Sequence, residues 1–199
     1  MDTLHIELAD PYEKSEVSVE EAIAKRKSVR HFKDEQLSFQ DISQLLWAAY
    51  GEGRVPSAGG IYPLRISLIV EKVELMEPGV YRYFPATHSL SEVLDGTVGR
   101  QLEQAAFGQI FLKEAAVTIV IAAEYREITR KYGPKGVVFT YMEAGHSGQN
   151  IYLQAQSLGL GTVAVGAFDE EKVRVLLNVS EEEEILYLMP VGKPKEGNK

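Results

Sequence analysis

The sequence contains no cysteine and only four histidines. The lack of cysteine excludes disulfides, thiolate metal sites, iron–sulfur clusters and a cysteine nucleophile, and it favours a reducing compartment. Basic residues are also outnumbered, because 21 Lys and Arg stand against 29 Asp and Glu and leave a formal net charge of −8. A protein that binds nucleic acid by neutralising phosphates is normally basic, so no nucleic-acid partner is expected.

Long hydrophobic runs are missing as well. The longest lies near residues 115–123, which is about half of the roughly 20 residues that a membrane-spanning helix needs. The N-terminal segment carries acidic residues early and has no apolar core, so we expect neither a signal peptide nor a membrane partner. We expect a cytoplasmic protein with one domain over residues 1–199, in which residues 1–16 form an N-terminal arm.

Hydrophobic periodicity and capping residues predict the secondary structure. Ser18, Ser38 and Asp169 are predicted helix N-caps, with Glu21 as the capping-box partner of Ser18. Helices are expected over 18–25, 38–50, 97–107, 124–132, 137–158 and 169–177, and strands over 64–73, 80–84, 115–123, 162–168 and 185–191. The turn at 77–79 predicts a hairpin, and the acidic run 181–184 is interpreted as a solvated connection. This order favours the α+β class, with a mixed sheet flanked by helices.

Several patterns resemble known motifs but lack the required context. Residues 159–164 match G-x-G-x-x-A, yet a predicted helix precedes them and a strand follows, so we interpret them as a turn. Glu143 and His146 have the spacing found in di-iron helix bundles, but the required second copy is missing. We therefore predict no metal site and interpret His146 as a polar residue satisfied among packed helices.

Three clusters remain as candidates for a site. Arg26, Lys27, Ser28 and Arg30 place four donors within five residues at a predicted helix end, which suits a phosphate. A solvated basic helix end that complements the macrodipole explains them equally well. The loop 54–63 is rich in Gly and Pro and lacks bulky side chains over 56–60, so a flat ligand could approach its backbone, although a structural corner is the alternative. Lys193 and Lys195 follow the last predicted strand, where a mobile basic chain end is the simpler reading.

The order and spacing of these clusters resemble the FMN-dependent nitroreductase family. The matching segments are R-x-S-x-R-x-F at 26–32, P-S-A-G-G-x-Y-P at 56–63, Q-N-I-Y-L-Q-A-Q-S-L-G-L-G-T at 149–162, Val165-Gly166, and P-x-G-K-P at 190–194. The version of the loop at 56–63, together with Glu143-Ala144-Gly145-His146, is most similar to the SagB-type branch of that family. Some members of that branch oxidise azolines in peptides.

The resemblance implies a nitroreductase-like fold and an intertwined homodimer with FMN at the subunit interface. It places Arg26, Lys27, Ser28 and Arg30 on the phosphate, ribityl chain and pyrimidine edge, with Arg30 near N1 and the C2 carbonyl. It also implies that the partner chain lays four loop residues against the flavin, namely Pro56, Ser57, Ala58 and Gly59. Val165 and Gly166 would form the strand end that faces N5. Lys193 and Lys195 of the basic tail would reach the phosphate.

The implied activity is ping-pong transfer of hydride from NAD(P)H through flavin N5 to a small acceptor such as a nitroaromatic or a quinone. FMN then carries the chemistry, and Tyr62 and His146 are the candidate proton donors, although packing or structural roles explain both. The alternatives are an azoline dehydrogenase and a flavin-binding module without turnover. The long helix at 137–158 is apolar on most faces, which fits either a central core helix or a dimer interface.

Overall fold

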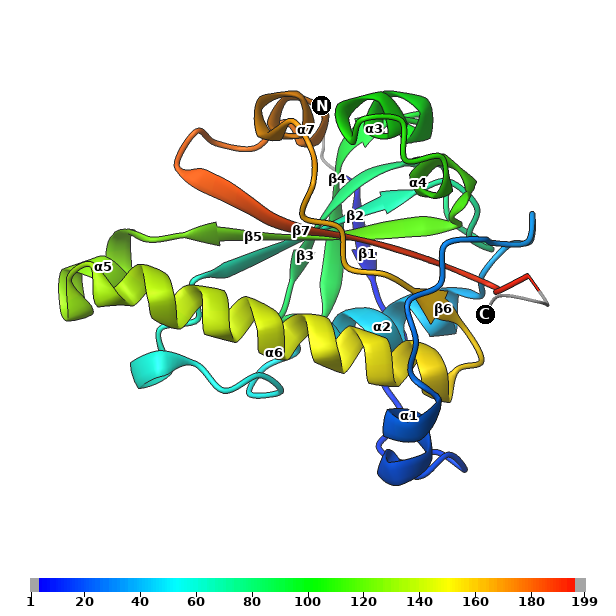
Figure 1. The fold of residues 1–199 in the computed structure, drawn as a ribbon, viewed down its shortest axis with the longest axis horizontal. Helices are drawn as coiled ribbons and strands as arrows, with labels where there is room; N and C mark the ends of the chain where they lie inside the picture. Colours follow the sequence, from blue (N-terminus) through cyan, green and yellow to red (C-terminus); the bar gives the residue numbers. More distant parts are fainter. Residues whose placement is uncertain (1–3, 196–199) are drawn as a thin grey trace.

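The computed structural model describes residues 4–195. Its central feature is a seven-stranded sheet in the order β1-β4-β3-β2-β5-β7-β6 (Figure 1). The strands are β1 (His5–Glu7), β2 (Leu64–Val70), β3 (Gly79–Phe84), β4 (Ser89–Asp95), β5 (Val117–Glu124), β6 (Gly161–Thr162) and β7 (Glu183–Gly192). The helices are α1 (Val19–Lys25), α2 (Phe39–Tyr50), α3 (Gly99–Ala105), α4 (Phe111–Glu114), α5 (Arg126–Tyr132), α6 (Lys135–Ser157) and α7 (Glu170–Leu177), with a 3₁₀ turn, η1 (Ala58–Gly60).

The sheet is antiparallel rather than mixed. Every pair among the seven strands runs antiparallel, and parallel pairing in the described chain is limited to the isolated bridges Ser28–Thr162 and Leu37–Val73. The predicted α+β class is confirmed. So is the hairpin at 77–79, since β3 pairs with β2 from Val70–Gly79 onward.

The sheet contains two strands that the sequence pattern did not predict. β1 falls in the expected irregular arm and pairs with β4, and β4 has only Ser89 and Leu90 buried. Neither strand carries a clear hydrophobic alternation: β1 is the edge strand and β4 lies next to it, between β1 and β3. The strand expected over 162–168 was too long: only β6 pairs as a strand, and Val165 adds a single bridge to Leu188.

The predicted helix caps agree with the structure. Ser38 and Asp41 form a complete capping box at the start of α2, and Asp169 accepts from the Lys172 backbone at the start of α7. Ser18 accepts from the Glu21 N–H, whereas the Glu21 carboxylate pairs with Lys25. The box predicted at α1 is therefore only half formed.

Helices cover both faces of the sheet (Figure 1). On one face, α2 and α6 bury Leu45, Leu46 and Ile151 against Leu68 and Ile119. On the other face, α3 and α7 bury Leu102 and Val173 in a second cluster with Val120 and Leu188. The two clusters share the sheet as a common wall, so the sheet is the layer that positions every loop around it.

The long helix α6 is not buried on every face within one chain. It buries a stripe that includes Glu143, Ala144 and Ile151, and its outer side exposes Val138, Tyr141 and Met142. The acidic run also differs from the prediction, because Glu183 begins β7 and Glu182, Glu183 and Glu184 each bind a partner. No helix within residues 4–195 combines the length and hydropathy needed to cross a membrane.

Candidate functional site

The fold brings the first basic cluster and the C-terminal tail together. The Val29 N–H donates to the Thr162 carbonyl at 2.9 Å, next to the bridge between Ser28 and Thr162. On the other side, the Lys195 N–H donates to the His31 carbonyl at 3.0 Å, and the Lys33 N–H donates to the Lys193 carbonyl at 2.8 Å. Residues 28–33 are thus held between β6 and the tail.

A cavity of about 410 Å³ opens where these segments meet. Its walls are the end of α1, the end of α6 and the turn into β6, closed by the tail. The lining residues are Lys25, Arg26, Lys27, Val29, Tyr152, Gln156, Gly159, Leu160, Gly161, Thr162, Pro194 and Lys195. Four of these lining residues are cationic, and none of the described residues that line the cavity is acidic. We refer to this space as the basic cavity.

The chemistry of the basic cavity suits an anion. The Arg26 guanidinium lies 5.2 Å from the centroid of the Tyr152 ring, which anchors it as a cation–π pair. The buried Thr162 Oγ1 has no hydrogen-bond partner within residues 4–195, so it is a donor that the protein itself leaves unused. Buried hydroxyls are normally paired, and a phosphate oxygen would pair this one.

Other residues predicted for the same group lie outside the basic cavity. Ser28 Oγ forms a 3.0 Å hydrogen bond with the Tyr152 hydroxyl, and Arg30 is exposed. The Lys193 ammonium lies 3.0 Å from Glu35 Oε2. Of the basic residues predicted for the cofactor, Arg26, Lys27 and Lys195 line the cavity, whereas Arg30 and Lys193 do not.

The Gly-rich loop is far from the basic cavity within one chain. Lys131 Nζ donates to the Gly59 carbonyl at 3.5 Å, which places η1 beside α5 and the first half of α6. The basic cavity instead contacts the last turns of α6, at Tyr152 and Gln156. α6 has 23 residues and spans roughly 35 Å, and the tip of the loop and the basic cavity lie against different parts of it.

The strand end at Val165 and Gly166 lies against β7. Val165 is buried and exchanges two backbone hydrogen bonds with Leu188, at 2.9 and 3.0 Å. Gly166 is exposed, and a Cβ built there would meet no atom within 4 Å. The backbone at Gly166 is therefore open to approach from outside the chain.

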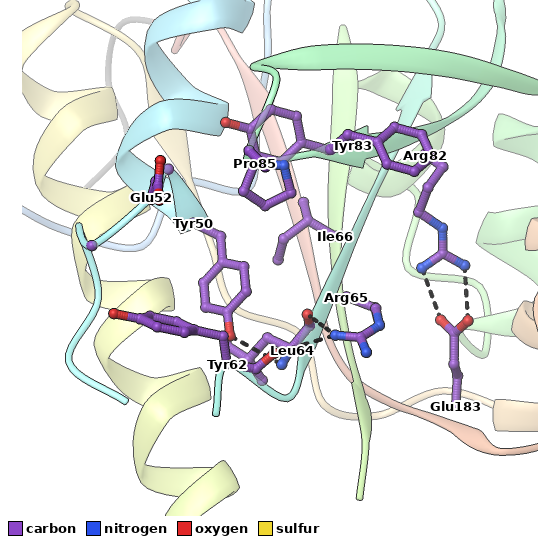
Figure 2. Close-up of a pocket in the computed structure, with 14 residues that line it drawn as sticks. Tyr50, Glu52, Tyr62, Leu64, Arg65, Ile66, Arg82, Tyr83, Pro85 and Glu183 are labelled. Atoms are coloured by element: carbon purple, nitrogen blue, oxygen red, sulfur yellow. Dashed lines mark hydrogen bonds and ion pairs between the residues drawn. The ribbon is translucent and has the colours of Figure 1, made fainter. Parts of the chain in front are cut away.

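A larger cavity of about 660 Å³ lies at the start of β2 and the end of β3, and no sequence pattern had indicated it. Its walls include Tyr50, Tyr62, Leu64, Ile66 and Tyr83, as Figure 2 shows. We refer to it as the aromatic cavity. Tyr62 is 41% exposed, has φ of 54° and packs edge-on against Tyr50 with centroids 6.1 Å apart. A tyrosine with positive φ is strained, so the contacts that hold this ring in place outweigh the strain of its backbone.

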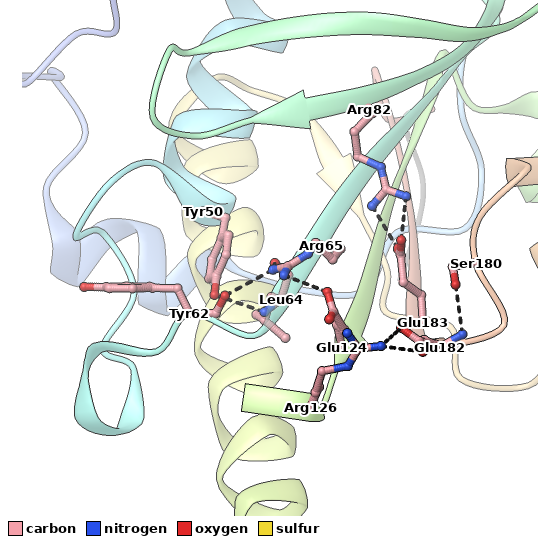
Figure 3. A network of polar contacts seen from close by, with 10 residues as sticks. All are labelled: Tyr50, Tyr62, Leu64, Arg65, Arg82, Glu124, Arg126, Ser180, Glu182 and Glu183. Carbon is pink, nitrogen blue, oxygen red and sulfur yellow. Dashed lines mark hydrogen bonds and ion pairs between the residues drawn. The ribbon is translucent and has the colours of Figure 1, made fainter. Parts of the chain in front are cut away.

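Ion pairs cross the sheet beside the aromatic cavity. The Arg82 guanidinium binds both carboxylate oxygens of Glu183, at 2.9 and 3.0 Å (Figure 2). Arg65 pairs with Glu124 at 2.9 Å on the neighbouring strands, and Arg126 pairs with Glu182 (Figure 3). The guanidinium groups near this cavity are thus already neutralised, so the cavity favours an uncharged ligand more than an anion.

The structure buries Glu143 and exposes His146, although His146 was the residue predicted to be buried among helices. His146 is exposed, whereas Glu143 is buried and accepts a 2.6 Å hydrogen bond from the Tyr50 hydroxyl. Burial raises the pKa of Glu143, which outweighs the lowering caused by hydrogen bonds from Tyr50 and Ser57 and by the charge of His146. The interpretation of His146 as a histidine satisfied among packed helices is wrong.

Comparisons with known proteins agree on one family. The sequence profile of the Nitroreductase family matches residues 23–193. A Methanocaldococcus jannaschii protein whose name assigns it to the nitroreductases is 43% identical over 198 residues, covering 96% of this chain and 98% of its own length. A Thermus thermophilus protein named NADH dehydrogenase is 27% identical over 203 residues, covering 88% and 86%.

Solved structures show the same fold. A crystal structure from Anabaena variabilis, also named as nitroreductase, superposes with a TM-score of 0.88 at 26% identity and covers 97% of this chain. This chain corresponds to 42% of that longer one. The class defined by fold and site is therefore an α+β protein with a basic, anion-accepting cavity. The chain belongs to the nitroreductase family.

Proposed function

We propose that this protein is an FMN-dependent oxidoreductase that takes hydride from NADH or NADPH and passes it to a small acceptor such as a nitroaromatic or a quinone. The observation that carries the proposal is the basic cavity: four cations, glycine backbone and an unpartnered buried Thr162 hydroxyl. This donor set fits the phosphate end of FMN. When bound, FMN supplies the N5 atom that accepts and donates the hydride.

The residues that would hold FMN follow from their placement. Arg26, Lys27 and Lys195 line the basic cavity and would bind the phosphate, with the Thr162 hydroxyl as a further donor. Lys193 adds positive charge from beside the cavity. Arg30, exposed at the end of the same segment, is assigned to the pyrimidine edge, where a cation stabilises the negative charge of reduced flavin.

The proposal includes a homodimer, because residues 56–59 do not line the basic cavity within one chain. The loop at 56–59 lies beside Lys131, at the other end of α6 from the basic cavity. A partner chain can supply that loop, and α6 exposes an apolar outer side on which a partner could pack. Gly166 has open space around its backbone, and we assign it to the flavin ring.

Mixing two inactive variants tests the shared site. Arg26→Ala removes a cation of the basic cavity, and Gly59→Val places a branched side chain where even a Cβ would lie 2.5 Å from Lys131 Nζ and the Tyr132 hydroxyl. If one chain supplies the basic cavity and the other the loop, a random mixture of the two variants regains about a quarter of the wild-type sites. Recovery no greater than the sum of the separate variants argues against the shared site.

The visible spectrum and rapid reduction test the cofactor and the reaction. The purified protein is expected to bind FMN and to be reduced by NADH or NADPH before any acceptor is added. A protein that stays colourless after incubation with FMN contradicts the cofactor assignment. Binding of FMN without reduction by either nicotinamide points instead to a flavin-binding module, and reduction by a peptide azoline points to the dehydrogenase alternative.

A further inference from the structure

The aromatic cavity is assembled from four parts of the chain that lie far apart in the sequence. The end of α2 with the residues after it, the start of β2, the end of β3 and the start of β7 all contribute to its walls. Its volume of about 660 Å³ falls within the roughly 300–1,000 Å³ that is typical of small-molecule sites. None of the residues that line it also lines the basic cavity. The aromatic cavity is therefore a second, separate candidate for a ligand site.

Two tyrosines in the walls of the aromatic cavity have hydroxyls that are already bonded to protein groups. The Tyr50 hydroxyl donates to Glu143 Oε1 at 2.6 Å and accepts from the Leu64 N–H at 3.1 Å. The Tyr83 hydroxyl forms a 2.8 Å hydrogen bond with His88 Nδ1. Figure 2 shows both tyrosines among the side chains that line the cavity. Because their polar ends are bonded to protein groups, these two residues offer a ligand mainly the carbon surface of their rings.

Two further rings of the lining, Tyr62 and Phe84, are only partly packed. Tyr62 is 41% exposed and Phe84 is 44% exposed. The backbone of Tyr62 is nevertheless fixed on both sides of the residue. Its N–H donates to Ser57 Oγ at 2.8 Å, and Arg65 Nη1 donates to its carbonyl at 3.2 Å. Strained backbone that the surroundings hold in place is characteristic of ligand sites, so a fixed but open ring with positive φ is a second indication of a ligand here.

The charges around the aromatic cavity disfavour an ionic ligand. Arg82 binds both carboxylate oxygens of Glu183, and Arg65 pairs with Glu124. The remaining charged residue of the lining, Glu52, is exposed and would repel an anion. None of the buried polar atoms left without a partner within residues 4–195 belongs to a residue that lines this cavity. An ion would therefore lose water here without gaining a free counterion, whereas an uncharged ligand has no such cost.

We propose that the aromatic cavity is a binding site for an uncharged aromatic compound, separate from the basic cavity. Aromatic rings attract one another in offset or edge-on arrangements, and Tyr50 and Tyr62 already meet edge-on in the wall. The rings therefore favour a flat unsaturated ligand over a saturated one of similar size. The paired guanidinium groups favour an uncharged ligand over an anion. This site does not depend on FMN as the cofactor, because it is formed by residues outside the basic cavity.

A matched pair of fluorescent probes tests the site on the full-length apoprotein. N-phenyl-1-naphthylamine is uncharged, and 8-anilinonaphthalene-1-sulfonate carries the same rings with an added sulfonate; both emit strongly only when they leave water. The uncharged probe is expected to bind wild type at one site per chain. Inorganic phosphate should not displace it, because the basic cavity is the site that suits phosphate. As a competitor, 2-naphthol should displace it more readily than decahydro-2-naphthol, its saturated counterpart.

Four variants locate the bound probe. Tyr62→Gly removes a ring and also relieves the positive φ, so it should fold and bind the uncharged probe about tenfold more weakly. Phe84→Ala removes the other partly exposed ring and should weaken binding as well, which decides the matter if Tyr62→Gly does not fold. Glu183→Gln leaves Arg82 without its counterion, so affinity for the sulfonate probe should rise several-fold when phosphate fills the basic cavity. Arg26→Ala, in the basic cavity, is the control and should bind the uncharged probe like wild type.

The outcomes separate this inference from the proposed function. The site is refuted if wild type does not bind the uncharged probe, which is also the result expected if a second copy of the chain covers the cavity. Wild-type affinity in both Tyr62→Gly and Phe84→Ala, displacement by phosphate, or weakened binding in Arg26→Ala refutes it as well. Equal displacement by the two naphthols overturns the preference for aromatic ligands, and an unchanged sulfonate affinity in Glu183→Gln overturns the charge argument. Failure to bind FMN would end the proposed function but leave the probe titrations decisive for this cavity.

Discussion

Gly161 offers a direct test of the basic cavity, because it is the point at which β6 touches the 26–30 segment. A Cβ built on Gly161 would lie 2.7 Å from both Cβ and Cγ1 of Val29 and 2.8 Å from Cγ2. Real Cβ atoms do not approach other heavy atoms so closely, so Gly161→Ala requires a movement. Val29 is buried in a cluster with Phe32 and Ala115, which resists that movement.

The cost can be worked from the two ways in which the structure can respond. If the 26–30 segment stays in place, the overpacked methyl costs about 1–3 kcal/mol. If the segment moves away, the hydrogen bond from the Val29 N–H to the Thr162 carbonyl is lost, which costs about 0.5–1.5 kcal/mol, and the packing of Val29 is weakened as well. Both responses predict a loss of about 1–3 kcal/mol in the free energy of unfolding, or a Tm lower by roughly 2–12 °C.

The same displacement separates Arg26 and Lys27 from the backbone of residues 159–162. We therefore expect Gly161→Ala to make the free energy of FMN binding less favourable by about 1.4 kcal/mol or more, which corresponds to a loss of affinity of about tenfold or more. Urea unfolding of the apoprotein and FMN titration measure the two effects. Gly166→Ala is the control for stability, because its Cβ would meet no atom within 4 Å. If Gly161→Ala matches wild type in both assays, the contact between Val29 and β6 does not shape the cavity.

The remaining predictions concern the dimer, the pH dependence of stability and the ion pairs. Gly145→Ala adds a methyl to the exposed side of α6, where it meets nothing within one chain. The free energy of unfolding of the isolated chain should therefore rise by up to about 1 kcal/mol. If α6 packs on a partner as proposed, sedimentation should show weaker self-association of this variant. Because the pKa of Glu143 is raised in the fold, its carboxyl contributes stability below about pH 4.5, and this contribution is lost as the pH rises through the raised pKa. Over that range the free energy of unfolding of Glu143→Gln, measured by chemical denaturation, should rise relative to wild type. Equal pH profiles would contradict this. Arg82→Ala leaves Glu183, whose side chain is 14% exposed, without its counterion and should cost about 2–3 kcal/mol in urea unfolding. Arg126→Ala removes an exposed pair and should cost less than about 1 kcal/mol, so equal losses would contradict the burial argument.

The sequence was informative wherever a structure depends on neighbouring residues. Helix α2 begins at the capping box formed by Ser38 and Asp41, and the turn at 77–79 joins β2 to β3, as both patterns indicate. The basic segment and the tail were also identified as related, and they meet at the basic cavity. The assignment of individual residues to FMN stays a prediction.

Only the tertiary structure decided which side of an element faces inward when its residues are chemically mixed. β1 becomes a strand because it pairs with β4, and β4 because it pairs with both β1 and β3, while no local alternation marks either of them. The spacing of Glu143 and His146 was visible in the sequence, but packing of α6 against α2 buries the carboxylate and exposes the imidazole. Gly59 lies beside α5 and the basic cavity lies at the end of α6, because packing against these helices decides positions that sequence order alone leaves open.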